Sequence, residues 1–193
     1  MVKKEIRIVG FDDGAFTPRS DALVPVIGTI FRGGLYLDGL LRTDVKVDGN
    51  EATEKLVKLI NSTRHKKQLK VLMLDGITLA GFNIVDIKEL NERTGIPVIV
   101  INRKLPDLEK VRRALKRFDD FEERWKAVEN AGEIKECYVK KGKKIYFQAK
   151  GMNEETAREV IKISTTRSFI PEPLRIAHII ATGIVRGESY GRA

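Results

Sequence analysis

The run LKVLMLDG at residues 69–76 constrains the fold more than any other part of the sequence. Its apolar residues are nearly consecutive, which is typical of a strand buried on both faces of a sheet. Sheets of this kind bind ligands outside the carboxyl ends of their strands. Asp75 stands at this end, and Gly76 lets the backbone turn or approach a ligand. The run alone leaves two interpretations open: a functional carboxylate, or a residue that only caps the next turn.

A second strand, near the N-terminus, is also predicted to end in carboxylates. Its side chains alternate as in a β-strand, and the strand ends at Asp12 and Asp13. Two apolar runs then flank Gly33 and Gly34, a pair that supplies the backbone angles of a tight hairpin turn. We therefore expect an antiparallel meander of three strands, which closes at Asp48.

The remaining pattern predicts an α/β fold. A helix within residues 84–94 separates the Asp75 strand from a second buried strand at residues 96–104, so these two strands should be parallel. Further helices are expected at residues 50–62, 106–118, 119–132 and 153–164 and within residues 167–189, and a hairpin at residues 134–151. Residues with known preferences mark the helix ends: Asn50, Pro106 and Asn153 at starts, Gly95 and Gly132 at stops. The expected whole is a mixed sheet, three antiparallel strands followed by parallel strands, flanked by helices in one domain of residues 1–193.

Composition excludes several classes of protein. The chain has 193 residues, of which 42% are hydrophobic and 33% charged, as in a globular protein. No apolar segment reaches the roughly 18 residues of a membrane span, and the N-terminus lacks the apolar core of a signal peptide, so we expect a cytoplasmic protein with no membrane partner. The single cysteine, Cys137, excludes an internal disulfide and a cysteine-rich zinc site. The net charge of +9 favours DNA or RNA as a partner, although dense surface charge also has structural causes.

Three aspartates, Asp12, Asp48 and Asp75, are each expected where a strand ends. Adjacent strands would bring Asp12 and Asp75 close together, and a hard divalent cation relieves the repulsion of two such carboxylates. Mg²⁺ or Mn²⁺ is the expected ion, because these ions activate water and stabilise the leaving oxygen in phosphodiester hydrolysis. The alternative is that the acids are unrelated turn and cap residues. For Lys104 the alternatives are a residue that holds a phosphate and an ordinary surface lysine. For His178 they are a metal ligand, a base or, more often in such helices, a hydrogen-bonded core residue.

The order of these features resembles the endonuclease V family, most closely a group of uncharacterised archaeal proteins related to it. VGFD, ending at Asp12, and LMLDG, which contains Asp75, match the family's two aspartate strands. VINRK places Lys104 at the position of a family lysine. IPEPLRIAH is close to the family's Pro-Glu-Pro followed by a helix, and it puts His178 where many members carry histidine.

Two further matches involve turns. In VDGNEATEKL, Asp48 and Gly49 stand where the family has a glutamate and a glycine that lead into a helix. AKG, ending at Gly151, resembles the family's glycine turn before a capped helix. The segment LYLDGLLRTDV contains no counterpart of the family's Pro-Tyr-Ile-Pro wedge, and GITLAGFNIVD lacks the family's His-Pro pair. The resemblance therefore leaves the recognised base open.

The resemblance implies a ribonuclease-H-like fold and a magnesium-dependent endonuclease that cuts DNA or RNA, in the family chiefly near deaminated bases such as inosine. The implied metal ligands are Asp12, Asp48 and Asp75. The implied catalytic set adds Lys104 and His178, and the expected substrate-binding turns contain Gly49, Gly76 and Gly151. Two alternatives remain: a non-catalytic nucleic-acid-binding protein with the same fold, and an enzyme that acts on nucleotides.

Overall fold

The computed structural model describes residues 2–189. The strands of its main sheet are β1 (Arg7–Asp13), β2 (Leu23–Arg32), β3 (Tyr36–Lys46), β4 (Val71–Asp75), β7 (Val98–Asn102), β8 (Lys135–Tyr138) and β9 (Lys144–Lys150). A separate small ribbon is formed by β5 (Thr78–Leu79) and β6 (Asn83–Ile84). The helices are α1 (Ala52–Ser62), α2 (Ile87–Thr94), α3 (Leu108–Leu115), α4 (Phe121–Asn130), α5 (Glu154–Ser164) and α6 (Glu172–Arg186), with a 3₁₀ turn at Lys140–Gly142.

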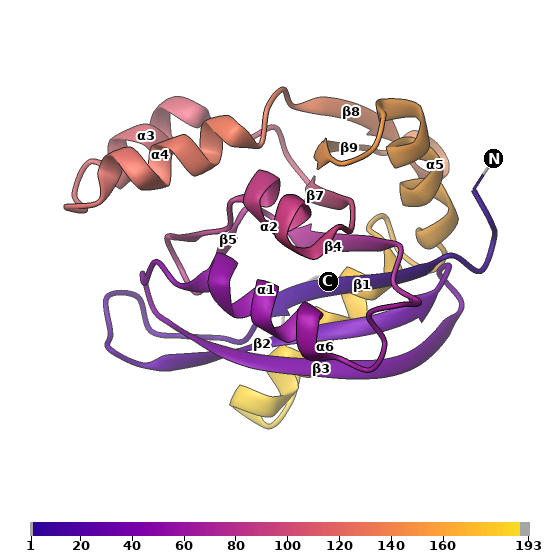
Figure 1. Cartoon of the computed structure of the whole chain (residues 1–193), viewed down its shortest axis with the longest axis horizontal. Coiled ribbons are helices and arrows are strands. Elements are labelled where there is room, and N and C mark those ends of the chain that lie inside the picture. The colour runs from indigo at the N-terminus through magenta and orange to yellow at the C-terminus, as the bar shows by residue number, and fades with distance from the viewer. Residues whose placement is uncertain (1, 190–193) are drawn as a thin grey trace.

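The main sheet is mixed, as expected, and its strand order is β3-β2-β1-β4-β7-β9-β8 (Figure 1). β1, β2 and β3 form the antiparallel meander, with the hairpin turn at the predicted glycine pair. β4 is parallel to both β1 and β7. β9 and β8 extend the sheet beyond β7 in antiparallel orientation, a position that the sequence did not predict.

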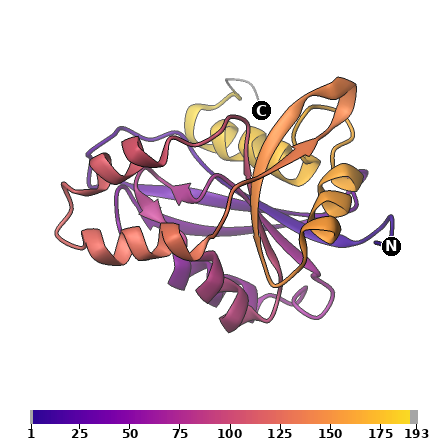
Figure 2. The same ribbon diagram turned by 90° about the horizontal axis from the view of Figure 1, so that it is seen from above.

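Side chains of the central strands alternate between two cores. Phe11 and Leu74 belong to the core that contains residues of α1 and α2, whereas Ile8 and Met73 belong to the core that contains residues of α5 and α6. Figure 2 shows α1 and α2 on one side of the sheet and α5 and α6 on the other. Because alternation continues to the strand ends, Asp12 and Asp75 share the face covered by α6, and Asp13 points to the opposite face.

The first turn of α6 is fixed tightly against β1 and β2. A Cβ atom at Gly10 would lie 2.6 Å from the carbonyl carbon of Pro173, so only glycine permits this approach. The hydroxyl of Thr29 donates a hydrogen bond of 2.6 Å to the carbonyl oxygen of Pro173. These contacts direct the helix along the sheet, so that His178 in the following turns lies beside the end of β1.

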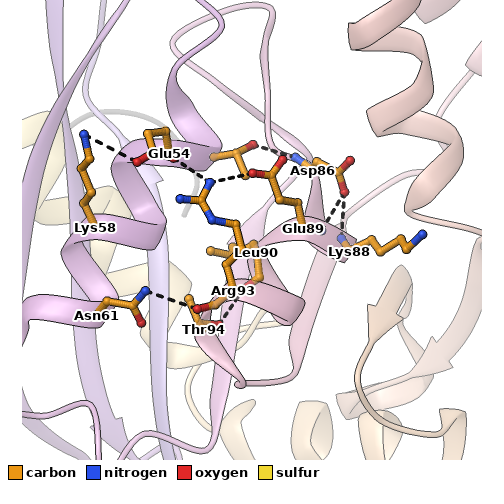
Figure 3. Close-up of polar contacts among 10 residues, drawn as sticks. Glu54, Lys58, Asn61, Asp86, Lys88, Glu89, Leu90, Arg93 and Thr94 are labelled. Atoms are coloured by element: carbon orange, nitrogen blue, oxygen red, sulfur yellow. Dashed lines mark hydrogen bonds and ion pairs between the residues drawn. The ribbon is translucent and has the colours of Figure 1, made fainter.

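Polar contacts also join α1 to α2 on the opposite face. Arg93 lies 2.6 Å from Glu54 of α1 and 2.7 Å from Glu89 of its own helix (Figure 3). Asp86 caps α2, because its carboxylate accepts hydrogen bonds from the backbone N–H groups of Lys88 and Glu89. Exposed ion pairs add little to stability, so the buried apolar side chains hold these helices in place.

Helix ends agree with the sequence in part. Gly95 ends α2 with φ of +71°, and Asn153 caps α5, as predicted. The prediction that Asn50 caps α1 is wrong, because the first N–H of this helix donates to the side chain of Asn83 instead, at 2.9 Å. The prediction that Pro106 lies in the first turn of α3 is also wrong, because this helix begins at Leu108 and Asp107 caps it. Within residues 2–189 no helix has the length and apolar character of a membrane span.

Candidate active site

Asp12 and Asp75 end neighbouring parallel strands. Phe11 of β1 is paired in register with Leu74 of β4, so the two aspartates occupy the next positions on strands that lie about 4.8 Å apart. Asp12 is buried, with 6% exposure. The pKa of Asp75 is raised, first by burial and then by the negative charge of Asp12. The structure thus brings these two predicted residues together as an electrostatically costly pair.

His178 also lies at this site. Its Nδ1 atom is 2.8 Å from Oδ2 of Asp12, and the side chain is 27% exposed. The other carboxylate oxygen of Asp12 accepts a hydrogen bond from the backbone N–H of Asp13. His178 is therefore next to the carboxylate pair and is not a core histidine.

The guanidinium group of Arg103 also lies at this end of the sheet. Arg103, the residue after β7, donates to Oδ2 of Asp75 at 2.9 Å and thereby lowers the pKa that burial raises. Lys104 is exposed, and it lines a shallow depression of about 470 Å³ together with Arg103, Asp75 and Gly76. The sequence analysis did not predict Arg103 as a site residue, although its position beside Lys104 at the end of a strand indicates one. The depression offers cationic groups to a phosphate next to the carboxylates.

The structure does not bring Asp48 to this pair. Its φ is +56°, and its Oδ1 atom accepts a hydrogen bond of 2.9 Å from the backbone N–H of Phe82. Its Oδ2 atom faces Arg117 at 3.8 Å. Across residues 2–189, no group of three or more His, Cys, Asp or Glu side chains is arranged to bind a metal. Asp48 as a metal ligand stays a prediction.

The two other predicted turn glycines lie in different places. Gly49 is next to Asp48, and its carbonyl oxygen accepts a hydrogen bond from Arg124. Gly151 lies at the opposite end of the sheet, because the residue before it pairs with Val98, the first residue of β7. A Cβ atom at Gly151 would be 2.3 Å from the side-chain nitrogen of Asn91, so this glycine serves a close approach to α2.

The sequence places Asp13 next to Asp12 at the end of the strand but indicates no function for it. Burial, followed by the charge of Asp12, raises the pKa of Asp13 to about 7. Its Oδ2 atom accepts a hydrogen bond of 2.8 Å from the backbone N–H of Ala80, in the loop between β5 and β6. Asp13 therefore ties this loop to the end of β1, on the face opposite to Asp12.

Two carboxylates suit a Mg²⁺ or Mn²⁺ site. Mg²⁺ is commonly held by one or two carboxylates and fills its remaining positions with water and phosphate oxygens. Asp12 and Asp75 supply this donor set, and a cation would relieve the repulsion that raises the pKa of Asp75. The geometry therefore fits a site built on these two carboxylates, and the third ligand that the resemblance implies, Asp48, stays a prediction.

Solved structures of endonuclease V share this fold. One is the Ciona intestinalis enzyme in complex with a 24mer DNA that contains an inosine followed by a ribo-adenosine: the TM-score is 0.62, the identity 18%, and the match covers 94% of this chain and 86% of that one. Human endonuclease V gives a TM-score of 0.62 at 15% identity, over 94% of this chain and 84% of that one. At such low identity the similarity defines the fold, which is that of an endonuclease V-like protein.

The family is defined by closer matches. The family model for Endonuclease dU matches residues 4–185, and the chain belongs to this family. A UPF0215 protein of Methanothermobacter thermautotrophicus is 55% identical over 193 residues, which cover 100% of this chain and 94% of that protein. A crystal structure of a protein of unknown function from Archaeoglobus fulgidus is 38% identical with a TM-score of 0.84, over 94% of this chain and 99% of that one.

Proposed function

We propose that this protein is a metal-dependent endonuclease that hydrolyses a phosphodiester bond in DNA or RNA. The observation that carries the proposal is the pairing of Asp12 with Asp75 at the carboxyl ends of adjacent strands. The net charge of +9 suits a polyanionic substrate. The name of the family and the DNA-bound endonuclease V of Ciona intestinalis support the same class of reaction.

The residues of the site divide into holding and positioning roles. Asp12 and Asp75 would hold Mg²⁺ or Mn²⁺, which when bound activates a water and stabilises charge on the phosphate oxygens. His178 fixes the carboxylate of Asp12 through their 2.8 Å contact. Arg103 would exchange its contact with Asp75 for a substrate phosphate, and Lys104 would attract the phosphate from the exposed rim of the depression. No side chain needs to act as a covalent nucleophile.

Deaminated bases are the first substrates to test. The family name refers to dU, and deoxyuridine is the deamination product of deoxycytidine. Inosine, present in the DNA bound to the Ciona intestinalis enzyme, is the corresponding product of adenosine. We therefore propose strands that contain uracil or hypoxanthine as the substrate class.

The test is a cleavage assay on end-labelled DNA and RNA oligonucleotides that differ at one position: uracil, hypoxanthine or an ordinary base. Wild type is expected to cut in Mg²⁺ or Mn²⁺ and not in EDTA. Asp75→Asn should abolish cutting without unfolding the chain, whereas Asp21→Asn, at a side chain that is 95% exposed, should leave it unchanged. Metal-independent cutting, undiminished cutting by Asp75→Asn, or tight binding without any product would contradict the proposal. The last result would identify a non-catalytic nucleic-acid-binding protein.

A further inference from the structure

The outer edge of β3 is open to another strand. β3 is the last strand in the order of the main sheet, so among residues 2–189 no strand pairs with its outer side (Figure 1). It is 11 residues long and contains no proline. Natural proteins usually protect an edge by shortness, proline, a bulge or a covering element. The register with β2 shifts once, between Ile30 and Phe31, so residues 39–46 of β3 form an uninterrupted and unprotected edge.

The main-chain groups of alternate β3 residues point away from β2. The N–H of Val47 donates to the carbonyl oxygen of Ala22, 3.0 Å away, at the position that continues the register of β2 and β3. Successive residues of an antiparallel strand direct their main-chain groups to opposite sides. The N–H and C=O groups of Leu40, Arg42 and Asp44 are therefore directed outward from the sheet.

Lys46 confirms the outward direction and closes the edge at one end. Its N–H donates to Oε1 of Glu51 at 2.6 Å, and its carbonyl oxygen accepts a hydrogen bond of 3.1 Å from the N–H of Gly49. The chain thus satisfies the outward groups of Lys46 by itself. Within residues 2–189, no such contact serves the main-chain groups of Arg42 and Asp44, so this part of the edge can bond to a further strand.

The side chains of this open segment are complementary to a second copy of the same segment. Arg42 and Asp44 lie on one face of β3, with the guanidinium 3.0 Å from the carboxylate and exposed fractions of 58% and 38%. When two copies pair antiparallel about a two-fold axis at Thr43, Arg42 lies opposite Asp44 of the partner subunit, and the reverse holds across the axis. The four charges then alternate in sign, and the pair within each chain is retained. Networks of this kind stabilise more than a single exposed pair does.

Charge selects this register over its neighbours. A two-fold axis at Arg42 or at Asp44 would place identical charges opposite each other, which destabilises a pair of strands. An axis at Val45 would require the main-chain groups of Lys46, which are already bonded within the chain. The axis at Thr43 pairs both charges and uses the open main-chain groups.

The same pairing covers apolar side chains at the edge. Leu40 is 54% exposed and lies on the same face as Arg42. In the joined sheet it faces the alkyl stem of the partner's Lys46, and lysine stems readily cover apolar surface. On the other face Leu41, a partly buried residue packed against the core that contains α1, lies opposite Val45 of the partner subunit. The pairing therefore removes apolar surface from water on both faces.

We propose that this edge binds a second copy of the chain, so that two main sheets join through antiparallel β3 strands about a two-fold axis at Thr43. The contact is isologous, because the same surface serves both subunits. The two-fold axis places the two pairs of Asp12 and Asp75 at opposite edges of the joined sheet, so each subunit keeps its own site. The inference therefore does not depend on the proposed function.

Analytical ultracentrifugation tests this pairing with charge variants at exposed positions. At about 100 μM, where a contact with a micromolar Kd is nearly saturated, wild type is expected to have the mass of two chains, each of 21.8 kDa. Arg42→Asp places acids opposite acids, and Asp44→Arg places bases opposite bases, so each should have the mass of one chain. Arg113→Asp, at an exposed position of α3, makes the same change in net charge as Arg42→Asp and should leave the dimer intact.

A mixture of the two single variants distinguishes this pairing from misfolding. The acids of the Arg42→Asp chain would face the bases of the Asp44→Arg chain, so equal amounts should form a heterodimer although neither variant associates alone. The double variant Arg42→Asp/Asp44→Arg should again be a dimer, because both pairs are restored with their signs exchanged. A monomeric wild type, a dimer that persists in either single variant, or a mixture that stays monomeric would overturn the inference. With a monomeric wild type, the edge would instead be a site for an extended segment of another protein.

Discussion

Replacement of Arg124 by methionine tests whether a buried guanidinium stabilises the site end of the sheet. Arg124 pairs with Asp120 at 2.6 Å and donates to three backbone carbonyl groups from two other segments. Methionine would occupy much of the same volume, but it would leave these acceptors without their donor. Removal of one partner from a buried ion pair costs about 3–5 kcal/mol. Because the Asp120 side chain is 29% exposed and can be rehydrated, we expect the lower part of this range, about 3 kcal/mol.

Urea unfolding followed by circular dichroism measures this loss directly. For a chain of this length, 1 kcal/mol corresponds to a change in Tm of roughly 2–4 °C, so the variant should melt roughly 6–12 °C lower. Lys126→Met, on the exposed side of the same helix, is the matched control and should change the free energy of unfolding by less than about 0.5 kcal/mol. A loss below about 1 kcal/mol for the Arg124 variant would refute the reasoning, since exposed ion pairs contribute that little.

Three other predictions concern packing, pH and the counter-ion of the site. Gly10→Ala should lower the free energy of unfolding by about 1–3 kcal/mol, because its Cβ would lie 2.6 Å from the first turn of α6; Gly183→Ala, where space is open, should not destabilise. The pKa of Asp13 is raised from 3.8 to about 7, so the metal-free folded state retains a proton that the unfolded state releases. Stability should therefore fall as pH rises through this interval and should do so less in Asp13→Asn; a flat wild-type profile in urea unfolding would contradict this. Arg103→Gln removes the cation that pairs with Asp75 and should strengthen Mg²⁺ binding in calorimetry by up to about five-fold. Weaker binding by this variant would contradict the idea that Arg103 and Mg²⁺ compete for Asp75.

The sheet could be predicted from sequence to the extent that local pattern decides it. Unbroken apolar runs identified β4 and β7 as buried parallel strands, and a glycine pair identified the β2–β3 hairpin. The position of β9 beside β7 could not be predicted, because tertiary packing decides which edge a hairpin joins. The prediction of the α1 cap failed for a similar reason, because Asn83, which is distant in sequence, accepts the hydrogen bond in place of the local candidate Asn50.

The candidate site was predictable where strand ends determine it. Asp12 and Asp75 follow the last paired residues of adjacent strands, so their proximity follows from the register. Asp48 also follows a strand, but its positive φ and its hydrogen bond with the Phe82 loop direct its carboxylate elsewhere. Arg124 gave no sequence signal, because an arginine in a charged helix is normally exposed, and its burial depends on carbonyl groups from other segments.

The central claim is that Asp12 and Asp75 form a divalent-cation site that serves phosphodiester cleavage. Calorimetric titration of Mg²⁺ or Mn²⁺ into wild type, Asp75→Asn and Asp48→Asn tests it most directly, with circular dichroism to confirm that each variant is folded. We expect binding by wild type, loss of binding in Asp75→Asn, and retained binding in Asp48→Asn, because the carboxylate of Asp48 accepts from the backbone N–H of Phe82 and faces Arg117. Equal binding by wild type and Asp75→Asn, or no binding by wild type even with a phosphorothioate oligonucleotide present, would contradict the claim.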